Sequence, residues 1–184
     1  MNSNKTAMYV DTPSRATRDL VRELIESDNE NATILDYGAG NGRNAYYIDD
    51  QVPAFVLAYD PYVHKKSLFP TLVKIDGIKH LEFDYVLCSF VANTLPREAR
   101  EHMFEALSQL HYQNLIIEVR SIADVEKIKN TFRRSDGYVT SRNTFQRGFE
   151  PADISRLNDF FGEHGMLYTK THHALSFIWR EELR

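Results

Sequence analysis

The fold is decided by residues Thr33-Ile-Leu-Asp-Tyr-Gly-Ala-Gly-Asn-Gly-Arg-Asn44. The β-branched and apolar residues at its start are typical of a central parallel strand, which is buried on both faces. Three glycines at alternate positions, Gly38, Gly40 and Gly42, then predict a tight turn that lets the backbone approach a ligand closely. A helix is expected over residues 43–50, with its unpaired N–H groups directed back toward the turn. The stretch therefore predicts a strand, a turn and a helix, with a binding site at the turn.

The acid at the end of this strand narrows the choice of ligand. Asp36 lies just before the glycine turn, where its carboxylate would repel a pyrophosphate bound at the helix N-terminus. The turn also departs from the G-x-G-x-x-G fingerprint of dinucleotide-binding proteins, because its third glycine comes one residue early. A ligand that carries positive charge and no phosphate suits this carboxylate better. The alternative is a glycine-rich turn in a fold that binds no cofactor.

The spacing D-x-G-x-G-x-G resembles the first motif of class I S-adenosylmethionine (SAM)-dependent methyltransferases. SAM carries an ammonium and a sulfonium group and no phosphate, so it meets the requirement set by Asp36. The resemblance implies an α/β, Rossmann-like fold with a seven-stranded, mostly parallel sheet, a C-terminal antiparallel strand pair and helices on both faces. It also implies SAM as the cofactor, with its methionine end held by Asp36, Gly38, Gly40, Asn41 and Gly42.

Two further acids follow later strands of the expected sheet. Asp60 follows a strand at residues 54–59 and precedes Pro61, at a place where a carboxylate accepts hydrogen bonds from both ribose hydroxyls. Asp76 follows a strand at residues 71–75, and the methyltransferase resemblance implies that it meets the adenine amino group. Each acid also has a plainer interpretation, because Asp-Pro and Asp-Gly are common turn sequences.

The acceptor side of the site is predicted from the loop after the fourth strand, residues 83–89. Open parallel sheets bind ligands beyond the carboxyl ends of their strands. We therefore expect Ser89 and Phe90 to contact the cofactor, and Ser89 and Asn93 to face the methyl acceptor. The loop lacks the Pro-Pro-aromatic motif of the amino-methylating DNA methyltransferases. Cys88 lies in the strand, outside any Pro-Cys motif, and is expected to be a buried thiol.

Residues 131–149 are predicted to form a hairpin on the substrate side of a single domain that spans residues 1–184. Its turn is expected at Asp136-Gly137. Arginines interleaved with aromatic residues can grip phosphates and stack on bases, which predicts a nucleic-acid partner. Arg142 and Gln146 are also candidates for the acceptor site. The alternative is a solvated hairpin whose aromatic residues anchor it to the core. The arginines concerned are Arg133, Arg134, Arg142 and Arg147.

Apolar periodicity and capping residues predict the remaining elements. A first helix is expected over residues 12–27, with Thr12 as its N-cap and Pro13 at its first position. Ser121 is expected to cap a helix that runs to about Asn130. Further helices are predicted at residues 97–110 and from Pro151 to Gly162 or Gly165, and further strands at residues 113–119, 166–171 and 174–180.

The composition excludes several classes of protein. The 184 residues suffice for one α/β domain, and a net charge of −4 gives no general field that attracts nucleic acid or an anionic membrane. No run of about 18 apolar residues predicts a transmembrane helix, and residues 1–6 lack the apolar core of a secretion signal. A single cysteine cannot form an intrachain disulfide, so we expect a cytoplasmic protein. The adjacent His172 and His173 would point to opposite faces of a strand, so no metal site is expected.

Several short pieces together are similar to a narrower family, the methyltransferases associated with DNA phosphorothioation, a bacterial modification and defence system. This resemblance implies a bacterial or phage protein linked to DNA modification. The chain differs from that family in the glycine turn, where Ala39 and residues 41–44 replace a Cys and a Gly-Asp pair. The matching pieces are Lys5-Thr6-Ala7, Ser14-Arg15, Asp36-Tyr37-Gly38, Tyr59-Asp60-Pro61-Tyr62, residues 93–98 and residues 140–146.

Three functions remain open at this stage. The chain is a methyltransferase acting on nucleic acid or another bacterial macromolecule, a methyltransferase acting on a small molecule, or a SAM-binding module that performs no transfer. The third possibility stands because the sequence identifies no catalytic base. A nicotinamide-dependent oxidoreductase is disfavoured by the glycine spacing and by Asp36.

Overall fold

The computed structural model describes residues 12–29, 31–62 and 67–180, so the Lys5-Thr6-Ala7 piece of the resemblance lies outside the described residues. Its main sheet has seven strands in the order β3-β2-β1-β4-β5-β10-β9. Strands β1 to β5 pair in parallel, and β10 runs antiparallel to both β5 and β9. This arrangement confirms the predicted fold class. The strands are β1 (Thr33–Tyr37), β2 (Phe55–Tyr59), β3 (Thr71–Leu72), β4 (Glu82–Ser89), β5 (His111–Arg120), β9 (Met166–Lys170) and β10 (Ala174–Arg180).

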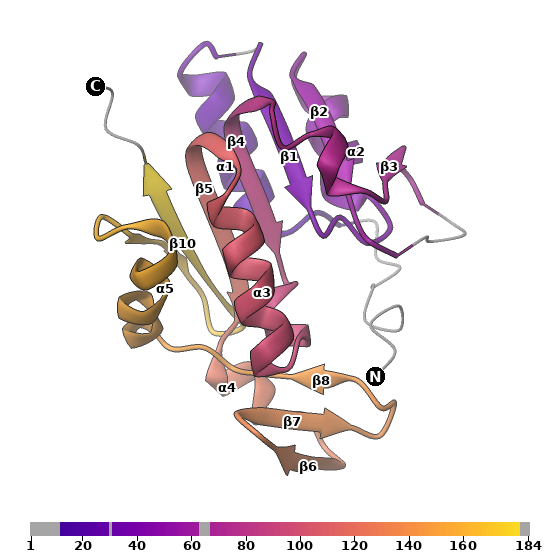
Figure 1. Ribbon diagram of the computed structural model, residues 1–184, viewed down its shortest axis with the longest axis vertical. Helices are drawn as coiled ribbons and strands as arrows, with labels where there is room; N and C mark the ends of the chain where they lie inside the picture. The colour runs from indigo at the N-terminus through magenta and orange to yellow at the C-terminus, as the bar shows by residue number, and fades with distance from the viewer. Residues whose placement is uncertain (1–11, 30, 63–66, 181–184) are drawn as a thin grey trace.

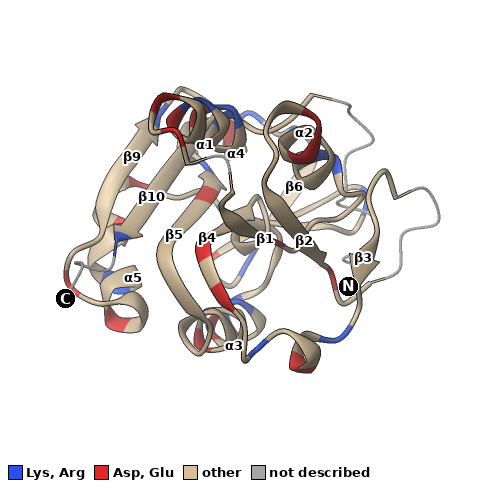
Figure 2. Ribbon diagram, turned by 90° about the horizontal axis from the view of Figure 1, so that it is seen from above, with Lys and Arg blue, Asp and Glu red and all other residues tan. Residues whose placement is uncertain are grey.

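Helices cover both faces of this sheet, as Figure 2 shows in a view from above. Strand β1 explains how the faces are built, because its side chains alternate: Ile34 packs on the side of α1 and α2, and Leu35 on the side of α3 and α5. Both side chains are fully buried. The helices are α1 (Arg15–Glu26), α2 (Arg43–Gln51), α3 (Arg97–Ser108), the short α4 (Ile122–Val125) and α5 (Ile154–Phe161).

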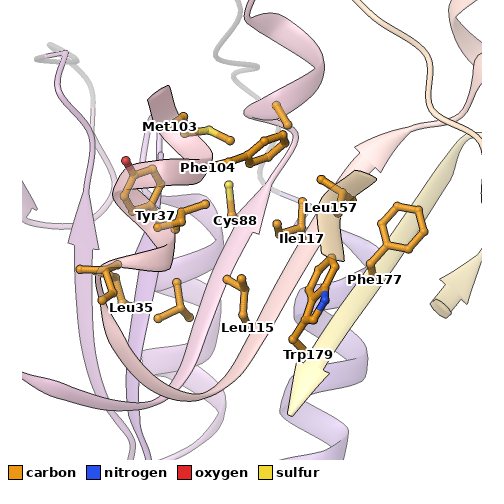
Figure 3. Close-up of a cluster of buried hydrophobic side chains, with 14 of the residues drawn as sticks. Leu35, Tyr37, Cys88, Met103, Phe104, Leu115, Ile117, Leu157, Phe177 and Trp179 are labelled. Atoms are coloured by element: carbon orange, nitrogen blue, oxygen red, sulfur yellow. The ribbon is translucent and has the colours of Figure 1, made fainter. Parts of the chain in front are cut away.

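Figure 3 shows the cluster on the side of α3 and α5, where β4, β5 and β10 meet the two helices. Cys88 lies fully buried in this cluster, and Met103 and Phe104, which are buried to more than nine-tenths, belong to the same cluster. Burial raises the pKa of the Cys88 thiol, so it stays protonated. The expectation of a buried thiol is confirmed. Trp179 closes the cluster at β10, with its indole N–H donating to Asn158 Oδ1 at 3.0 Å.

Two predicted helix boundaries are wrong. Helix α1 is capped by Ser14 and not by Thr12, because Ser14 Oγ accepts the Thr17 N–H at 3.2 Å. Ser121 caps α4 as expected, but the helix has four residues and does not reach Asn130. After α4 the backbone hydrogen bonds join residues three apart, as in a 3₁₀ turn; the Ile128 N–H, for example, donates to Val125 O at 3.0 Å. Asn130 then adopts a φ of 57°, a left-handed conformation that ends helical structure.

A small antiparallel sheet replaces the predicted two-stranded hairpin. Its first turn is Ser135-Asp136, one residue earlier than predicted, because Gly137 pairs with Arg134 as part of a strand. Figure 1 shows this sheet beyond the carboxyl ends of β1 and β4. The short third strand has no counterpart in the sequence prediction. The strands are β6 (Thr131–Arg134), β7 (Gly137–Thr140) and β8 (Phe145–Gln146).

Three short 3₁₀ turns complete the described chain: η2 (Ile75–Gly77), η3 (Ala92–Thr94) and η4 (Pro151–Asp153). Within the described ranges no helix has the length and apolar character that crossing a membrane requires.

Candidate functional site

A cavity of about 1570 Å³ lies at the edge of the main sheet where the parallel strands end. The strand order reverses between β1 and β4, and ligands of open α/β sheets bind at such a switch point. Sites for single small molecules have volumes of about 300–1000 Å³, so this cavity has room for a cofactor and a second molecule. Its walls come from the glycine turn after β1, the turn after β2, residues 89–95, one side of α3, the α4 region, the β7–β8 turn and His173.

The glycine turn has a backbone that only glycine adopts readily. Gly38, Gly40 and Gly42 have φ angles of 74°, 59° and 76°. A Cβ atom at Gly38 would lie 2.3 Å from Val91 Cγ2, so the turn after β1 lies directly against the segment after β4. The Gly38 N–H donates to Tyr59 O at 2.7 Å, which also ties the turn to the end of β2. Three strand ends therefore converge on one wall of the cavity.

Asp60 lines this cavity and holds the glycine turn in place. Its side chain is 7% exposed, and its Oδ2 accepts the Gly40 N–H at 2.9 Å. Its Oδ1 accepts the Tyr62 N–H at 2.8 Å. A carboxylate has about four acceptor sites, so a side chain of this type can accept hydrogen bonds from both backbone N–H groups and ligand hydroxyls. Pro61 and Asn41 line the same part of the cavity.

Asp36 lies behind the turn and is absent from the cavity lining. It is 1% exposed, and its Oδ2 accepts the N–H of Ala45 in the first turn of α2 at 3.2 Å. Burial raises the pKa of Asp36 to about 7, while the Ala45 N–H and the nearby Arg43 guanidinium act in the opposite direction. The carboxylate thus caps the N-terminus of α2. Because Asp36 does not line the cavity, it can affect a bound ligand only through its charge.

Two other predicted cofactor residues also lie outside the cavity lining. Gly42 is the N-cap of α2, and a Cβ atom there would lie 2.8 Å from Phe69 Cβ. Asp76 lies in η2 with its side chain 84% exposed, and it pairs with Lys79 at 3.2 Å.

Ser89 lines the cavity, and its hydroxyl belongs to a buried polar network. Ser89 Oγ donates to Glu118 Oε2 at 2.9 Å and lies 3.1 Å from Ser14 Oγ. The Glu118 Oε1 accepts the Ala16 N–H at 3.2 Å. Burial raises the pKa of Glu118, and the hydrogen bonds from Ser14, Ser89 and Ala16 counteract this. Sequence reasoning missed Glu118, although an acid in the otherwise apolar run 115–119 was a visible signal.

Phe90 and Asn93 follow β4 and line the cavity. Phe90 has a φ of 59°, a strained conformation for a bulky residue, and its N–H donates to Glu118 O at 2.7 Å. Asn93 is 1% exposed, and its Nδ2 donates to Gln146 Oε1 at 3.2 Å. Two residues predicted for the acceptor side and far apart in the sequence are therefore in contact. Within the described part of the chain, Asn93 Oδ1 has no hydrogen-bond partner, which costs about 1–3 kcal/mol when a ligand does not supply one.

Of the four arginines expected to grip nucleic acid, three are exposed and one is engaged within the protein. Arg142 is exposed on the β7–β8 turn and lines the cavity, while Arg133 and Arg134 are exposed on β6. The Arg147 guanidinium is half-buried and pairs with Asp153 at 2.6 Å and with Asp136 at 3.5 Å. It also stacks over the Phe149 ring at 4.2 Å. Arg147 thus connects parts of the protein and is not presented to a partner.

A histidine that sequence reasoning set aside also lines the cavity. His173 Nδ1 lies 2.7 Å from Asp124 Oδ1, and Asp124 Oδ2 lies 3.4 Å from Arg120 Nε. The turn between β9 and β10 lies at the same edge as the end of β5, because Ala174 pairs with Arg120. The contact between His173 and Asp124 follows from this strand register. In the sequence, the visible signal was a histidine at the turn of an expected antiparallel strand pair. No group of three or more metal-ligand side chains occurs among the described residues.

The sequence matches no protein-family model and none of the curated proteins. The fold is similar to a 1,6-didemethyltoxoflavin-N1-methyltransferase of Burkholderia thailandensis, crystallised with bound 1,6-didemethyltoxoflavin and S-adenosylhomocysteine (SAH), with 17% identity over 91% of this chain and 78% of that chain and a TM-score of 0.62. It is similar to the PH0226 protein of Pyrococcus horikoshii OT3, with 11% identity over 95% of both chains and a TM-score of 0.65. It also resembles the SAH-bound magnesium protoporphyrin IX methyltransferase of Synechocystis PCC 6803, with 16% identity over 89% of this chain and 80% of that chain and a TM-score of 0.57. The chain therefore has the fold of class I SAM-dependent methyltransferases.

Proposed function

We propose that this protein is a SAM-dependent methyltransferase whose cofactor lies along the glycine turn and the end of β4. The observation that carries the proposal is the position of Asp60, which lines the cavity at the switch point of the sheet and holds the turn that shapes it. Asp60 would bind the ribose, and Gly38, Gly40 and Asn41 the methionine end. Pro61, Ser89 and Phe90 would complete the contacts. Several solved proteins of this fold hold SAH or SAM, which supports the same cofactor here.

Asp36 would act at longer range than the lining residues. A cationic cofactor favours the ionised form of this buried carboxyl, and the ionised form in turn attracts the cofactor's ammonium group. Gly42 would contribute by shaping the turn. We place the Asp76 side chain outside the direct contacts, because it is exposed and paired with Lys79.

Methyl transfer requires the protein chiefly to align the methyl donor with the acceptor. When bound, SAM supplies a methyl group by in-line displacement at its sulfonium carbon. The protein's part is to hold the acceptor in line with that carbon and to exclude water. An acceptor that must lose a proton needs a base on the same cavity. We propose that His173, oriented by Asp124, would take that proton, and that Asn93, Gln146 and Arg142 would hold the acceptor; the His173–Asp124 contact and the position of all four residues on the cavity lining support this.

We further propose a nucleic acid as the acceptor, as the resemblance to the phosphorothioation-associated methyltransferases implies. Arg142 at the cavity and the exposed Arg133 and Arg134 on β6 support this. In this proposal the chain is a single domain, and residues 131–149 lie on its substrate side. Phosphate contacts by two or three arginines predict binding that weakens steeply with added salt, and replacing Arg142 with Ala should reduce that dependence. A salt-insensitive interaction, or no binding of DNA or RNA at low salt, would point to a small-molecule acceptor.

Mass spectrometry of the purified, denatured protein tests the cofactor directly. We expect SAM or SAH to be released in an amount comparable to the protein. Incubation of bacterial lysate fractions with the protein and methyl-labelled SAM then separates an enzyme from a binding module. Label in a fraction treated with the native protein, and not with a protein carrying Asp60→Ala, supports transfer. Cofactor release with no label in any fraction would favour the binding module.

A further inference from the structure

Asn93 and Gln146 form a pair of polar side chains in the part of the cavity that lies outside the proposed cofactor contacts. Asn93 lies in η3, which follows β4 of the main sheet, and Gln146 lies in β8 of the small sheet. Their amides are joined by one hydrogen bond of 3.2 Å. Both residues are more than nine-tenths buried, with exposures of 1% and 8%, and both line the cavity.

This pair retains hydrogen-bonding capacity that the protein does not use. An amide side chain has an oxygen that accepts and an NH₂ group that donates. Among the described residues, Asn93 Oδ1 receives no hydrogen bond, and the Gln146 NH₂ group donates to no other side chain or carbonyl. Exchanging the oxygen and nitrogen of both amides gives the same outcome, because one acceptor and one donor still remain. The pair therefore keeps an unused acceptor beside an unused donor in either assignment.

The neutral charge of the two amides and the apolar residues around them indicate what kind of ligand group would bind to Asn93 and Gln146. Native proteins pair nearly all buried polar atoms, and a bound ligand is one way in which an unpaired amide on a cavity wall finds its partner. The amides are neutral and suit a neutral polar edge, whereas phosphate and carboxylate are recognised by arginine forks. Phe90, Val91, Leu95 and Met103 line the same cavity and offer apolar surface to a flat ring. Val91 also contacts the glycine turn, which puts the amides near the proposed methyl donor.

We propose that Asn93 and Gln146 recognise the methyl acceptor, and that the acceptor is a planar nitrogen heterocycle of the nucleobase type. Each nucleobase has a donor and an acceptor side by side on its pairing edge, and paired contacts from Asn or Gln read such edges. The proposal rests on the proposed function, because it assigns the remaining part of the same cavity to the second substrate. The base can belong to a free nucleoside or to a single strand.

The test uses the native protein saturated with SAH, labelled with ¹⁵N and observed by NMR through the side-chain amide signals of Asn93 and Gln146. Adenosine, cytidine, guanosine and thymidine are titrated separately at millimolar concentration. We expect at least one nucleoside to bind and to shift both amide signals. If SAH binds and none of the four shifts either signal, the proposal is overturned while the cofactor assignment stands. If SAH itself does not bind, the proposed function fails, and this inference fails with it.

Variants connect the binding to the amides. Asn93→Leu and Gln146→Met each remove an amide and keep apolar volume, and either should weaken the best nucleoside about tenfold while SAH affinity stays within about twofold. Gln113→Leu, an exposed amide on β5, is the matched control and should change neither. Unchanged nucleoside affinity in a variant that still binds SAH overturns the proposal. Should a variant lose SAH binding through misfolding, the titration of the native protein still decides.

A final arm separates the two sources of the base. A short single-stranded oligonucleotide containing all four bases is titrated under the same conditions. Binding at least tenfold tighter than the best nucleoside, with the same amide shifts, assigns the base to a nucleic acid. Equal or weaker binding assigns it to a free nucleoside or a related small heterocycle. Both results support the amide pair as the reader of the acceptor.

Discussion

Single residues set the shape of the proposed cofactor wall, and Gly38 is the most constrained of them. Its φ of 74° and the Val91 methyl group 2.3 Å from a virtual Cβ leave no room for a side chain. Gly77, by contrast, has nothing within 4 Å of such an atom. The two glycines therefore form a matched pair for substitution, one required by the fold and one not.

Gly38→Ala should lower the free energy of unfolding by about 2 kcal/mol or more, because the left-handed backbone and the overlap with Val91 both cost free energy. Gly77→Ala should change it by less than about 0.5 kcal/mol. Urea unfolding followed by circular dichroism measures both. Equal losses at the two positions would mean that the turn is not held against the β4 segment as described.

Asp36 gives the molecule a pH-dependent stability. The pKa of its buried carboxyl is raised from 3.8 to about 7, so the folded state holds the proton more tightly than the unfolded chain does. The stability that this group contributes is fully present below about pH 4 and is lost as the pH rises through about 7. The ligand-free protein should therefore lose a few kcal/mol from this carboxyl over that range.

Asp36→Asn removes the titrating group and retains an oxygen for the Ala45 N–H. The free energy of unfolding of the variant minus that of the native protein should rise steadily as the pH increases from about 4 to about 7. Urea unfolding of both proteins at a series of pH values gives this difference, and other titrating groups cancel in it. A difference that stays constant with pH would show that Asp36 is not buried as described.

At the scale of elements, the small sheet is fixed to the main domain by ion pairs. The Arg100 side chain on α3 is 2% exposed, donates to Leu95 O at 2.9 Å and pairs with Asp136 in the turn of the small sheet. Arg147 pairs with the same carboxylate and with Asp153. These contacts hold the β6–β7 turn and the residue after β8 against α3 and η4, and Gln146 on the acceptor side of the cavity directly precedes Arg147.

Asp136→Ala should lower the free energy of unfolding by about 3 kcal/mol, because it leaves the buried Arg100 charge without its partner and next to Arg147. Asp159→Ala, on the exposed side of α5, is the control and should have little effect. Chemical denaturation measures both. If the two variants lose the same small amount of stability, the ion pairs do not hold the small sheet.

The sequence predicts the long elements well and the short ones poorly. Strands such as β4 and β5 contain apolar runs, so their existence follows from the pattern, whereas their places in the sheet were implied by the methyltransferase resemblance. Strand β8 has two residues and α4 has four, too few for a period to be read. The placement of Asp36 shows a second limit: its position at the end of a strand is readable, but the bond to Ala45 depends on how α2 packs. The His173–Asp124 pair needed the register of β10 on β5, which no local pattern contains.

At the scale of the whole molecule, a ligand that binds only the folded state stabilises it. A SAM concentration about 100 times the dissociation constant should raise the free energy of unfolding by about 2.7 kcal/mol. The melting temperature should therefore rise with SAM or SAH concentration. NAD at the same concentrations should leave it unchanged, because the turn and its acid suit no diphosphate.

The central claim is that the cavity beside Asp60 holds SAM. Calorimetric titration of the native protein with SAM tests it, alongside Asp60→Ala and the control Asp49→Ala, an exposed acid on α2. We predict one site per chain, an affinity lowered by about 1–3 kcal/mol in Asp60→Ala through the loss of charge-assisted hydrogen bonds, and no change in Asp49→Ala. No binding of SAM to the native protein, or an affinity that Asp60→Ala leaves unchanged, would contradict the account.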